Sequence, residues 1–292
     1  MTIIACIRGG LGNQMFQYAM GKSLAEKHGT DLLLDIRLFK NHEMHNGFEL
    51  DRVFMHCAKS ASEDDIRALL GWKYYKLTMR ILSFDQFAFF RGKNFYIEKG
   101  ISYNQDIEIL PRDCYLSGYW QSENYFKTIE HIIRSDFIFK QKLNDKNAES
   151  ADQILSADSV SLHVRRGDYI NNSDSVHSNC TPGYYADAIN YCNARLADPV
   201  YFIFSDDIDW VRNNLEIKSR HFFINHNRGE NSFHDMNLMS LCKHNIIANS
   251  SFSWWGAWLN SHGNKIVIAP EKWFNSDMFF PNDIVPDTWV TI

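Results

Sequence analysis

The stretch SLHVRRGDY, residues 161–169, places a histidine at the end of an apolar run and two arginines and an aspartate directly after it. That run, SVSLHV, is short and apolar, as is typical of a buried β-strand. Four similar runs follow it, separated by helix-like segments: PVYFIF, HFFIN, HNIIAN and KIVIA. Because strands that alternate with helices form parallel sheets, we expect the second half of the chain to be a doubly wound α/β domain.

A crossover helix is expected after the first of these strands. Thr181 and Pro182 are typical N-cap and first-turn residues. The apolar residues that follow recur on one helical face: Tyr185, Ile189, Cys192 and Leu196. A helix at this place can join two parallel strands, as the predicted topology requires.

The first half of the chain opens with a strand, a loop and a helix. Residues 2–7 (TIIACI) predict the strand, residues 8–14 (RGGLGNQ) a glycine loop, and the apolar spacing from Phe16 onward the helix. A backbone rich in glycine can approach a ligand closely. The loop departs from the dinucleotide-binding motif G-x-G-x-x-G, because Met15 occupies the place of its third glycine.

The length of 292 residues favours two domains over one. The stretch SENYFKTIEHIIRSDF, with Ser122 as its N-cap, predicts a helix that closes the first domain. Polar residues 140–153 are expected to be a linker. We therefore predict an N-terminal α/β domain over 1–139 and a C-terminal Rossmann-like domain over 154–292.

Composition excludes several classes of protein. Thirty basic and 35 acidic residues give a net charge of −5, which is not the footprint of a nucleic-acid binder. Six cysteines without a C-x-x-C pair indicate free thiols in a reducing compartment. No apolar run approaches the roughly 20 residues of a membrane span, so we expect a soluble, cytoplasmic protein.

Polar clusters follow three of the predicted strands. His163, Arg165 and Asp168 lie at the end of the first, the SDD segment 205–207 ends the second, and the NSSFS segment 249–253 ends a third. In open parallel sheets, ligands bind just outside the carboxyl ends of the strands. The three clusters are therefore expected to converge on one binding site.

Each cluster has a chemical and a structural interpretation. Arg165 and Arg166 can bind a diphosphate or form surface ion pairs, and strand alternation favours Arg165, on the side of His163, for the ligand. Ser250 or Ser251 can hold a phosphate at a helix start, cap that helix, or do both. The tryptophans of FSWWGAWL are expected to pack in the core.

The pair Asp206 and Asp207 has three interpretations. It could bind a divalent cation, cap the following helix, or accept hydrogen bonds from a purine. We rate the metal below the other two, because an arginine is already available as the counter-charge. No metal is required.

Taken together, five motifs resemble one family: GGLGNQMFQYAMGKSLA, LSGYWQSENYF, HVRRGDY, YFIFSDD and NSSFSWWGAWLN. They are similar to the inverting, GDP-fucose-dependent α-1,2-fucosyltransferases of bacterial polysaccharide synthesis, glycosyltransferase family 11, within the wider fucosyltransferase superfamily. The resemblance covers nearly the whole chain. It implies a GT-B-like pair of Rossmann-type domains with a deep cleft between them.

The same resemblance implies a reaction. The carboxyl half would hold GDP-fucose, and the amino half would contact a galactose-terminated oligosaccharide or lipid-linked glycan whose 2-hydroxyl receives L-fucose with inversion. O-antigen or another surface polysaccharide would be the product, and neither a metal nor another cofactor would be needed. Two rivals are a non-catalytic carbohydrate- or nucleotide-binding module and a metal-dependent glycosyltransferase that uses Asp206 and Asp207.

The resemblance also implies roles for single residues. Arg165 would pair with the diphosphate, and His163 and Asp206 would approach the base or ribose. The phosphates would contact the start of the last polar cluster: Ser250, Ser251 and Phe252.

In the glycine loop, Gly10 and Gly12 would contact substrate and Asn13 would face the reacting centre. Asp168 is a candidate general base, and its pairing with Arg166 is an equally good interpretation.

Residues 72–93 (WKYYKLTMRILSFDQFAFFRGK) carry five basic residues and one acid among many aromatics. An anionic lipid surface could hold such a segment in weak peripheral contact. An ordinary amphipathic helix with snorkelling lysines is the interpretation that we favour.

Overall fold

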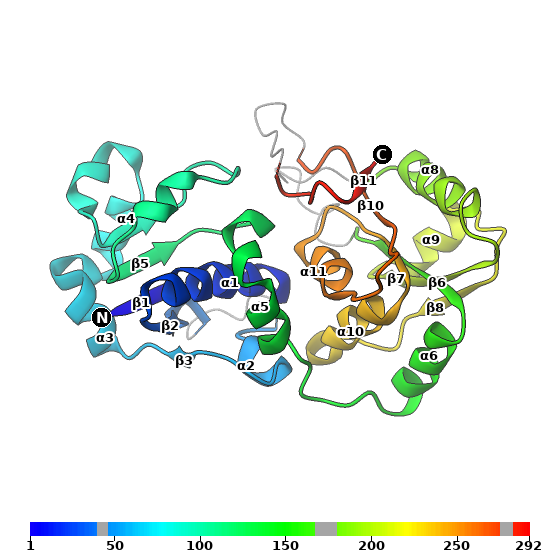
Figure 1. Ribbon diagram of the computed structural model, residues 1–292, viewed down its shortest axis with the longest axis horizontal. Coiled ribbons are helices and arrows are strands. Elements are labelled where there is room, and N and C mark those ends of the chain that lie inside the picture. The colour runs from blue at the N-terminus through cyan, green and yellow to red at the C-terminus, as the bar shows by residue number, and fades with distance from the viewer. Residues whose placement is uncertain (40–45, 167–179, 275–282) are drawn as a thin grey trace. The chain divides into compact units, whose positions relative to one another are not determined.

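The computed structural model describes residues 1–39, 46–166, 180–274 and 283–292. The chain divides into two compact units, Met1–Lys140 and Gln141–Ile292. Each unit contains a sheet flanked by helices (Figure 1). We describe each unit by itself.

In unit 1 the described strands form one sheet in the order β3-β2-β1-β5-β4, and every pairing is parallel. The strands are β1 (Thr2–Cys6), β2 (Asp31–Asp35), β3 (Lys59–Ser60), β4 (Phe95–Ile97) and β5 (Cys114–Ser117). The helices are α1 (Leu11–His28), α2 (Leu50–Val53), α3 (Glu63–Leu70), α4 (Lys76–Leu82) and α5 (Glu130–Asp136). The described residues of this unit also form six 3-10 turns: η1 (Arg37–Phe39), η2 (Gly71–Tyr74), η3 (Asp85–Arg91), η4 (Gln105–Ile109), η5 (Glu123–Tyr125) and η6 (Lys127–Ile129).

Helix α1 lies close against this sheet because Gly21 has no side chain. A Cβ atom on Gly21 would come within 2.7 Å of Leu32 Cδ1 and 3.1 Å of Ala5 Cβ. The helix ends at Gly29, whose left-handed backbone (φ 62°) lets its N–H donate to the carbonyl groups of the last turn. The strand, loop and helix predicted at the amino end are therefore confirmed.

In unit 2 the described strands form a second parallel sheet in the order β11-β10-β9-β6-β7-β8. The strands are β6 (Asp158–Val164), β7 (Pro199–Ser205), β8 (His221–Ile224), β9 (His244–Ile246), β10 (Val267–Ala269) and β11 (Val290–Thr291). The helical elements are α6 (Asp145–Leu155), α8 (Pro182–Asn193), α9 (Ile208–Asn214), η7 (Gly229–Asn231), α10 (Phe233–Leu241) and α11 (Ser251–Leu259). Two parallel sheets confirm the predicted α/β class.

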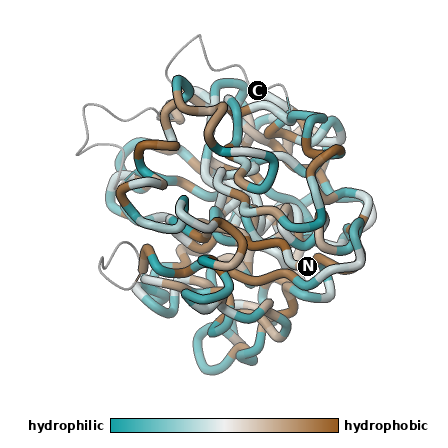
Figure 2. Tube along the Cα trace, turned by 90° about the vertical axis from the view of Figure 1, so that its left-hand side faces the viewer, coloured by the Kyte–Doolittle hydropathy of each residue, from teal (hydrophilic) through white to brown (hydrophobic). Residues whose placement is uncertain are grey.

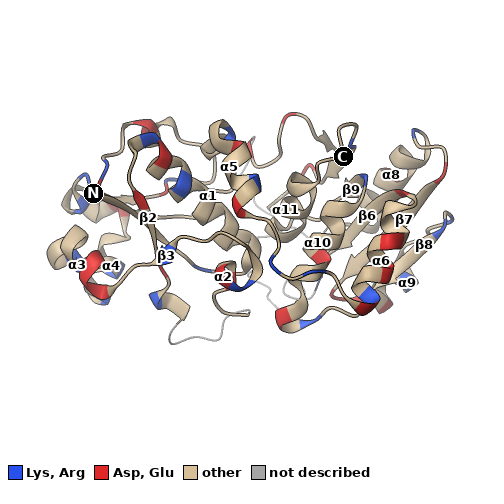
Figure 3. Cartoon of the chain, turned by 60° about the horizontal axis from the view of Figure 1, so that its bottom comes forward, with Lys and Arg blue, Asp and Glu red and all other residues tan. Residues whose placement is uncertain are grey.

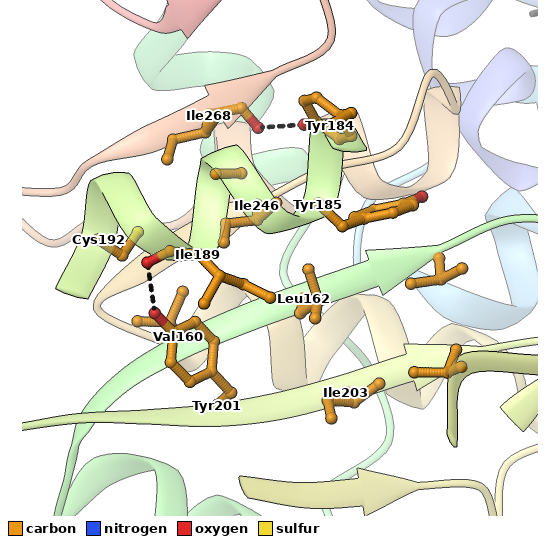
Figure 4. Packing of buried hydrophobic residues seen from close by; sticks show 13 residues of the cluster. Val160, Leu162, Tyr184, Tyr185, Ile189, Cys192, Tyr201, Ile203, Ile246 and Ile268 are labelled. Carbon is orange, nitrogen blue, oxygen red and sulfur yellow. Dashed lines mark hydrogen bonds between the residues drawn. The ribbon is translucent and has the colours of Figure 1, made fainter. Parts of the chain in front are cut away.

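The crossover helix α8 begins and packs as the sequence predicts. The Thr181 hydroxyl accepts a hydrogen bond from the N–H of Tyr184 (3.2 Å), which caps the helix. Tyr185 and Ile189 lie in a buried cluster between α8 and the sheet (Figure 4). The Tyr184 hydroxyl donates to the carbonyl of Ile268 on β10 (3.2 Å), so the helix is tied to the sheet at its amino end.

Two sequence-based expectations differ from the structure. Much of the expected linker, residues 140–153, belongs to α6, which buries Ala151 and Ile154 in the core of unit 2. Two apolar side chains, three residues apart, are too few to give a clear helical pattern in the sequence. The long helix expected from Ser122 is also interrupted, because the backbone of Phe126 (φ −142°, ψ 5°) is not helical, and α5 begins only at Glu130.

Charged side chains of both signs are interspersed over the described elements (Figure 3). None of the described helices is long and apolar enough to span a bilayer.

Candidate functional site

Each sheet contains one point at which the direction of strand addition reverses. In unit 2, β7 and β8 follow β6 on one side, whereas β9, β10 and β11 lie on the other. In unit 1, β2 and β3 follow β1 on one side, whereas β5 and β4 lie on the other. Ligands of open α/β sheets bind outside the carboxyl ends of the strands at such switch points. The switch points therefore lie between β6 and β9 and between β1 and β5.

At the unit 2 switch point, Arg165 follows β6 and is paired with the end of the neighbouring strand β7. Its Nε lies 3.3 Å from Asp206 Oδ2, and its side chain is 31% exposed. The other carboxylate oxygen of Asp206 accepts a hydrogen bond from the N–H of Arg166 (2.9 Å). Asp206 thus holds both the guanidinium of Arg165 and the backbone that follows it.

Arg166 turns to different partners. Its guanidinium lies 3.9 Å from the ring centroid of Trp210, and its Nε lies 3.7 Å from Asp207 Oδ2. Asp207 also caps α9 by accepting from the N–H of Trp210 (3.0 Å). The capping interpretation of Asp207 is therefore confirmed.

His163 is buried beside these arginines. Its ring lies 6.2 Å from that of Phe252 at the start of α11, which brings the first and third polar clusters together. Its Nδ1 is buried and makes no hydrogen bond to the described residues. Burial, with a smaller contribution from the charge of Arg165, lowers the pKa of His163 to about 3. The imidazole is therefore neutral and can donate one hydrogen bond to a ligand or accept one from it.

The start of α11 combines capping with accessible polar groups. The Ser250 hydroxyl accepts a hydrogen bond from the N–H of Phe252 (3.3 Å), so Ser250 is the N-cap. Ser253 points inward and donates to the carbonyl of Ala248 (3.4 Å). Ser251 and Phe252 are half-buried at the first turn. The tryptophans of this helix are buried, as expected: Trp254, Trp255 and Trp258.

At the unit 1 switch point, a hydrogen bond joins the two strands' loops. Asn13 Oδ1, in the first turn of α1, accepts from Gln121 Nε2 (2.7 Å), which follows β5. Gly9 makes room for Asn13, since a Cβ atom there would lie 2.9 Å from its Nδ2. Gly10 is the N-cap of α1, whereas Gly12 is buried within the helix. Of these two glycines, which were both predicted to contact substrate, Gly10 alone belongs to the loop.

Further unpaired polar atoms lie near this bond. The Arg8 guanidinium lies 4.7 Å from the ring centroid of Tyr119, and its Nε is buried without a hydrogen-bond partner in the described residues. The N–H of Arg8 donates to Gln17 Oε1 (2.8 Å), but the Nε2 of Gln17 is buried and has no such partner. Buried unpaired donors are costly, and they are common at ligand sites.

The chain after β5 is held in an unusual conformation. Trp120 has a positive φ of 57°, which is uncommon outside glycine. The N–H groups of Tyr119 and Trp120 both donate to the carboxylate of Glu98 (2.5 and 2.9 Å), which holds this backbone and presents Gln121 to Asn13.

The sequence did not single out Arg8, Gln17, Tyr119 or Gln121. The motif LSGYWQSENYF does contain a signal, because Tyr119, Trp120 and Gln121 come just after the strand that ends at Ser117. Asp168 lies outside the described residues. No group of three or more potential metal ligands occurs among the residues that the structure describes.

Comparison with known proteins now identifies the family. The model described as "Glycosyl transferase family 11" matches residues 2–292. The chain belongs to glycosyl transferase family 11. This glycosyltransferase is 36% identical over 302 residues to the α-1,2-colitosyltransferase of Escherichia coli, covering 99% of this chain and 98% of the relative.

A second relative of this family 11 glycosyltransferase is the O-antigen biosynthesis glycosyltransferase WbnK of Escherichia coli. It is 32% identical over 303 residues, with 99% of each chain covered. Among solved structures, the Bradyrhizobium α-1,6-fucosyltransferase NodZ superposes with a TM-score of 0.56 at 16% identity. The match covers 88% of this chain and 92% of NodZ and shows a shared fold.

Proposed function

We propose that this glycosyltransferase transfers L-fucose from GDP-fucose to the 2-hydroxyl of a galactose-terminated glycan, with inversion, in the synthesis of O-antigen or another surface polysaccharide. The observation that carries the proposal is the unit 2 switch point, where Arg165, His163 and the start of α11 surround one place. A guanidinium and helix-start N–H groups suit the diphosphate of a nucleotide sugar.

The proposed reaction requires groups that neutralise the negative charge developing on GDP as it leaves. The acceptor oxygen forms a bond to the anomeric carbon while the bond from that carbon to the phosphate oxygen breaks. The electron pair of the broken bond leaves with GDP, and the hydroxyl proton passes to a base. Arg165, oriented by Asp206, and the first turn of α11 would stabilise the departing diphosphate.

His163 would bind the base or ribose as a neutral hydrogen-bonding group, because burial keeps it uncharged. Ser251 is our proposed phosphate ligand, since Ser250 is already used as the cap. Asp168 is our proposed general base. Among the described residues, its alternative partner, Arg166, contacts Asp207 and Trp210.

Unit 1 would bind the acceptor. Amide groups and an arginine stacked on an aromatic ring are typical of sites for neutral, hydroxyl-rich sugars. Asn13 and Gln121 form such a polar pair, and Arg8 on Tyr119 adjoins it.

We further propose that no metal takes part. Asp206 faces Arg165, and Asp207 faces Arg166 and caps α9, so a cation would have to displace an arginine from each carboxylate. This favours an arginine as the counter-charge over the metal-dependent rival.

The relative named a colitosyltransferase favours a second candidate donor. Colitose is L-fucose without its 3-hydroxyl, so a single hydrogen bond could distinguish the two donors. GDP-colitose is therefore the alternative to GDP-fucose.

The test measures GDP release from each donor, with and without lactose, N-acetyllactosamine or galactosyl-N-acetylgalactosamine, and determines the new linkage by NMR. We expect acceptor-dependent release from GDP-fucose, an α-1,2 linkage, and no change in chelator. Faster turnover of GDP-colitose would reverse the donor assignment. A folded protein that binds GDP and turns over neither donor would favour a binding module, and activity lost in chelator and restored by a divalent cation would favour the metal-dependent rival.

A further inference from the structure

Residues 72–90 of unit 1 expose an unusual amount of apolar surface. Of the fourteen large apolar side chains found strongly exposed among the described residues, seven lie here. We call them the aromatic surface: Trp72, Tyr75, Leu77, Ile81, Phe84, Phe89 and Phe90. Five of them belong to η2, α4 and η3, and Tyr75 and Phe84 are the N-caps of α4 and η3. Phe89 is 91% exposed. An exposed apolar patch of this kind marks an interaction site.

The aromatic surface is held in place by two buried cations. Lys73 donates to the carbonyl of Arg91 (2.7 Å) and to Asn94 Oδ1 (2.5 Å). Arg91 in turn donates to the carbonyls of Leu82 (2.7 Å) and Phe84 (3.1 Å). These bonds tie η2, the end of α4 and η3 together, so the apolar side chains are presented by a fixed framework.

The surface also carries positive charge. Lys76, Arg80 and Lys93 are exposed, and Asp85 is the one acid in residues 72–93. Because Lys73 and Arg91 are buried, the exposed charges of this segment are those three basic residues and Asp85, whereas the whole chain has a net charge of −5. Figure 2 views the chain from the side on which α4 lies and shows apolar stretches of the tube among polar ones.

The acids of the neighbouring helix α3 have local partners. Glu63 accepts a hydrogen bond from the Tyr74 hydroxyl (2.7 Å), and Asp65 forms a capping box with Ser62. Asp64 lies 4.0 Å from Arg67. Arg67 thus offsets the charge of Asp64, whereas the neutral donors of Glu63 and Asp65 fix the positions of those carboxylates without removing their charge.

We propose that the aromatic surface docks unit 1 onto an anionic lipid bilayer. The ordinary amphipathic helix favoured by the sequence does not describe this segment, because it is broken into η2, α4 and η3 and exposes apolar side chains while burying Lys73 and Arg91. Aromatic side chains prefer the interface between headgroups and acyl chains, and nearby basic residues gain from an anionic membrane. A second copy of the chain fits less well, because a two-fold interface would bring Lys76, Arg80 and Lys93 close to their own copies. The proposal does not depend on the donor or the acceptor.

The test uses the full chain and vesicles of phosphatidylcholine with or without phosphatidylglycerol. Binding is measured by flotation, and insertion by quenching of tryptophan fluorescence with brominated lipids. All eight tryptophans lie in the described residues, and Trp72, at 60%, is the one that is strongly exposed. We expect binding to the anionic vesicles alone, weakening in high salt, and quenching that disappears in Trp72→Phe.

Two double variants separate the apolar and charged contributions. Phe89→Ser with Phe90→Ser, and Lys76→Glu with Arg80→Glu, should each weaken binding about tenfold or more. Matched controls are Ile109→Ser, at an 84% exposed site, and Lys218→Glu, at an 82% exposed side chain, which should bind like the parent chain.

Several results would overturn the proposal. They are equal binding to both vesicle types, no binding to either, or quenching that survives in Trp72→Phe. Self-association that the phenylalanine variants abolish, in a chain that does not bind vesicles, would assign the surface to a second copy instead. Loss of turnover on a free oligosaccharide in the phenylalanine variants would assign it to the acceptor site.

Discussion

The two switch points are built on the same topology but from different chemistry. The one in unit 2 contains a guanidinium, a carboxylate and a buried neutral histidine: Arg165, Asp206 and His163. The one in unit 1 is centred on a hydrogen bond between two amides, Asn13 and Gln121. In both units, the groups lie at or just beyond the carboxyl ends of adjacent parallel strands.

This difference follows from what each half is proposed to bind. Charge that develops on a leaving diphosphate is best met by preorganised positive groups, whereas a neutral sugar is recognised by hydrogen-bond donors and acceptors. On the proposed function, the strand order sets where a ligand binds, and the charge of the side chains there sets which ligand it is.

Arg165→Ala is expected to have the largest effect and tests whether the charged switch point of unit 2 stabilises the leaving group. Loss of the guanidinium should lower kcat/KM about 10³-fold, since removal of one preorganised donor costs roughly 10²–10³-fold even for a neutral group. Arg165→Lys should recover part of the loss, because it keeps the charge without the fork. Arg212→Ala, a 53% exposed side chain, is the matched control. Activity within threefold of the parent, in a variant with unchanged circular dichroism, would refute the role.

Buried ionisable groups of unit 2 should give opposite pH dependences. The folded-state pKa of His163 is about 3, below the usual value, so its contribution to stability is lost as pH falls from about 7 to about 5, by about 2 kcal/mol. Burial raises the pKa of Asp235 to about 7 despite a hydrogen bond from Asn227 (2.7 Å). Its contribution therefore runs the other way, and stability falls by about 2 kcal/mol as pH rises from about 5 to about 7.

Urea unfolding of two variants at both pH values checks these signs. Relative to the parent chain, His163→Gln should be more stable at the lower pH than at the higher, and Asp235→Asn should show the reverse. Equal slopes in the two variants would mean that neither group titrates as its burial indicates.

In unit 1, burial raises the pKa of Asp35, but hydrogen bonds from Arg37 and Tyr115 lower it more. Asp35 therefore stabilises the fold above its unfolded pKa and loses that effect only in stronger acid.

Gln121→Ala tests the neutral switch point. The change removes one hydrogen bond to Asn13 and should lower kcat/KM for the acceptor about tenfold, while KM for the donor stays unchanged. Gln121→Glu offers a matched comparison, since it keeps the length but cannot donate. An increase in donor KM alone would mean that this pair does not contact the acceptor.

The smallest expected effects separate two adjacent hydroxyls. Ser250→Ala removes the cap of α11 and should destabilise the protein by about 1 kcal/mol. Ser251→Ala should leave the melting temperature unchanged and weaken GDP binding severalfold, as measured by calorimetry. The opposite pattern would exchange the roles of the two serines.

Local signals predicted much of the fold. The strand runs, the cap at Thr181 and the buried face of α8 follow from residues within a few positions of one another. The same kind of signal failed at α6, whose two deeply buried apolar residues are Ala151 and Ile154, and at Phe126, whose backbone breaks an otherwise regular apolar spacing.

The candidate site was predictable only in part. The positions of Arg165, His163 and Ser250 after strands were visible in the sequence, because the carboxyl end of a strand is a local feature. That Asp206 pairs with Arg165 and that Asp207 caps a helix required the side-chain geometry.

By itself, the sequence determined where most of the strands and helices form, since periodicity and capping act over a few residues. The tertiary structure alone decided which strands are neighbours, because parallel pairing joins segments that are distant along the chain. That order brings Gln121 to Asn13 across 108 residues and Asp206 to Arg165 across the β6–β7 pair. Long-range pairing of this kind depends on packing of the whole sheet, which no local stretch of residues encodes.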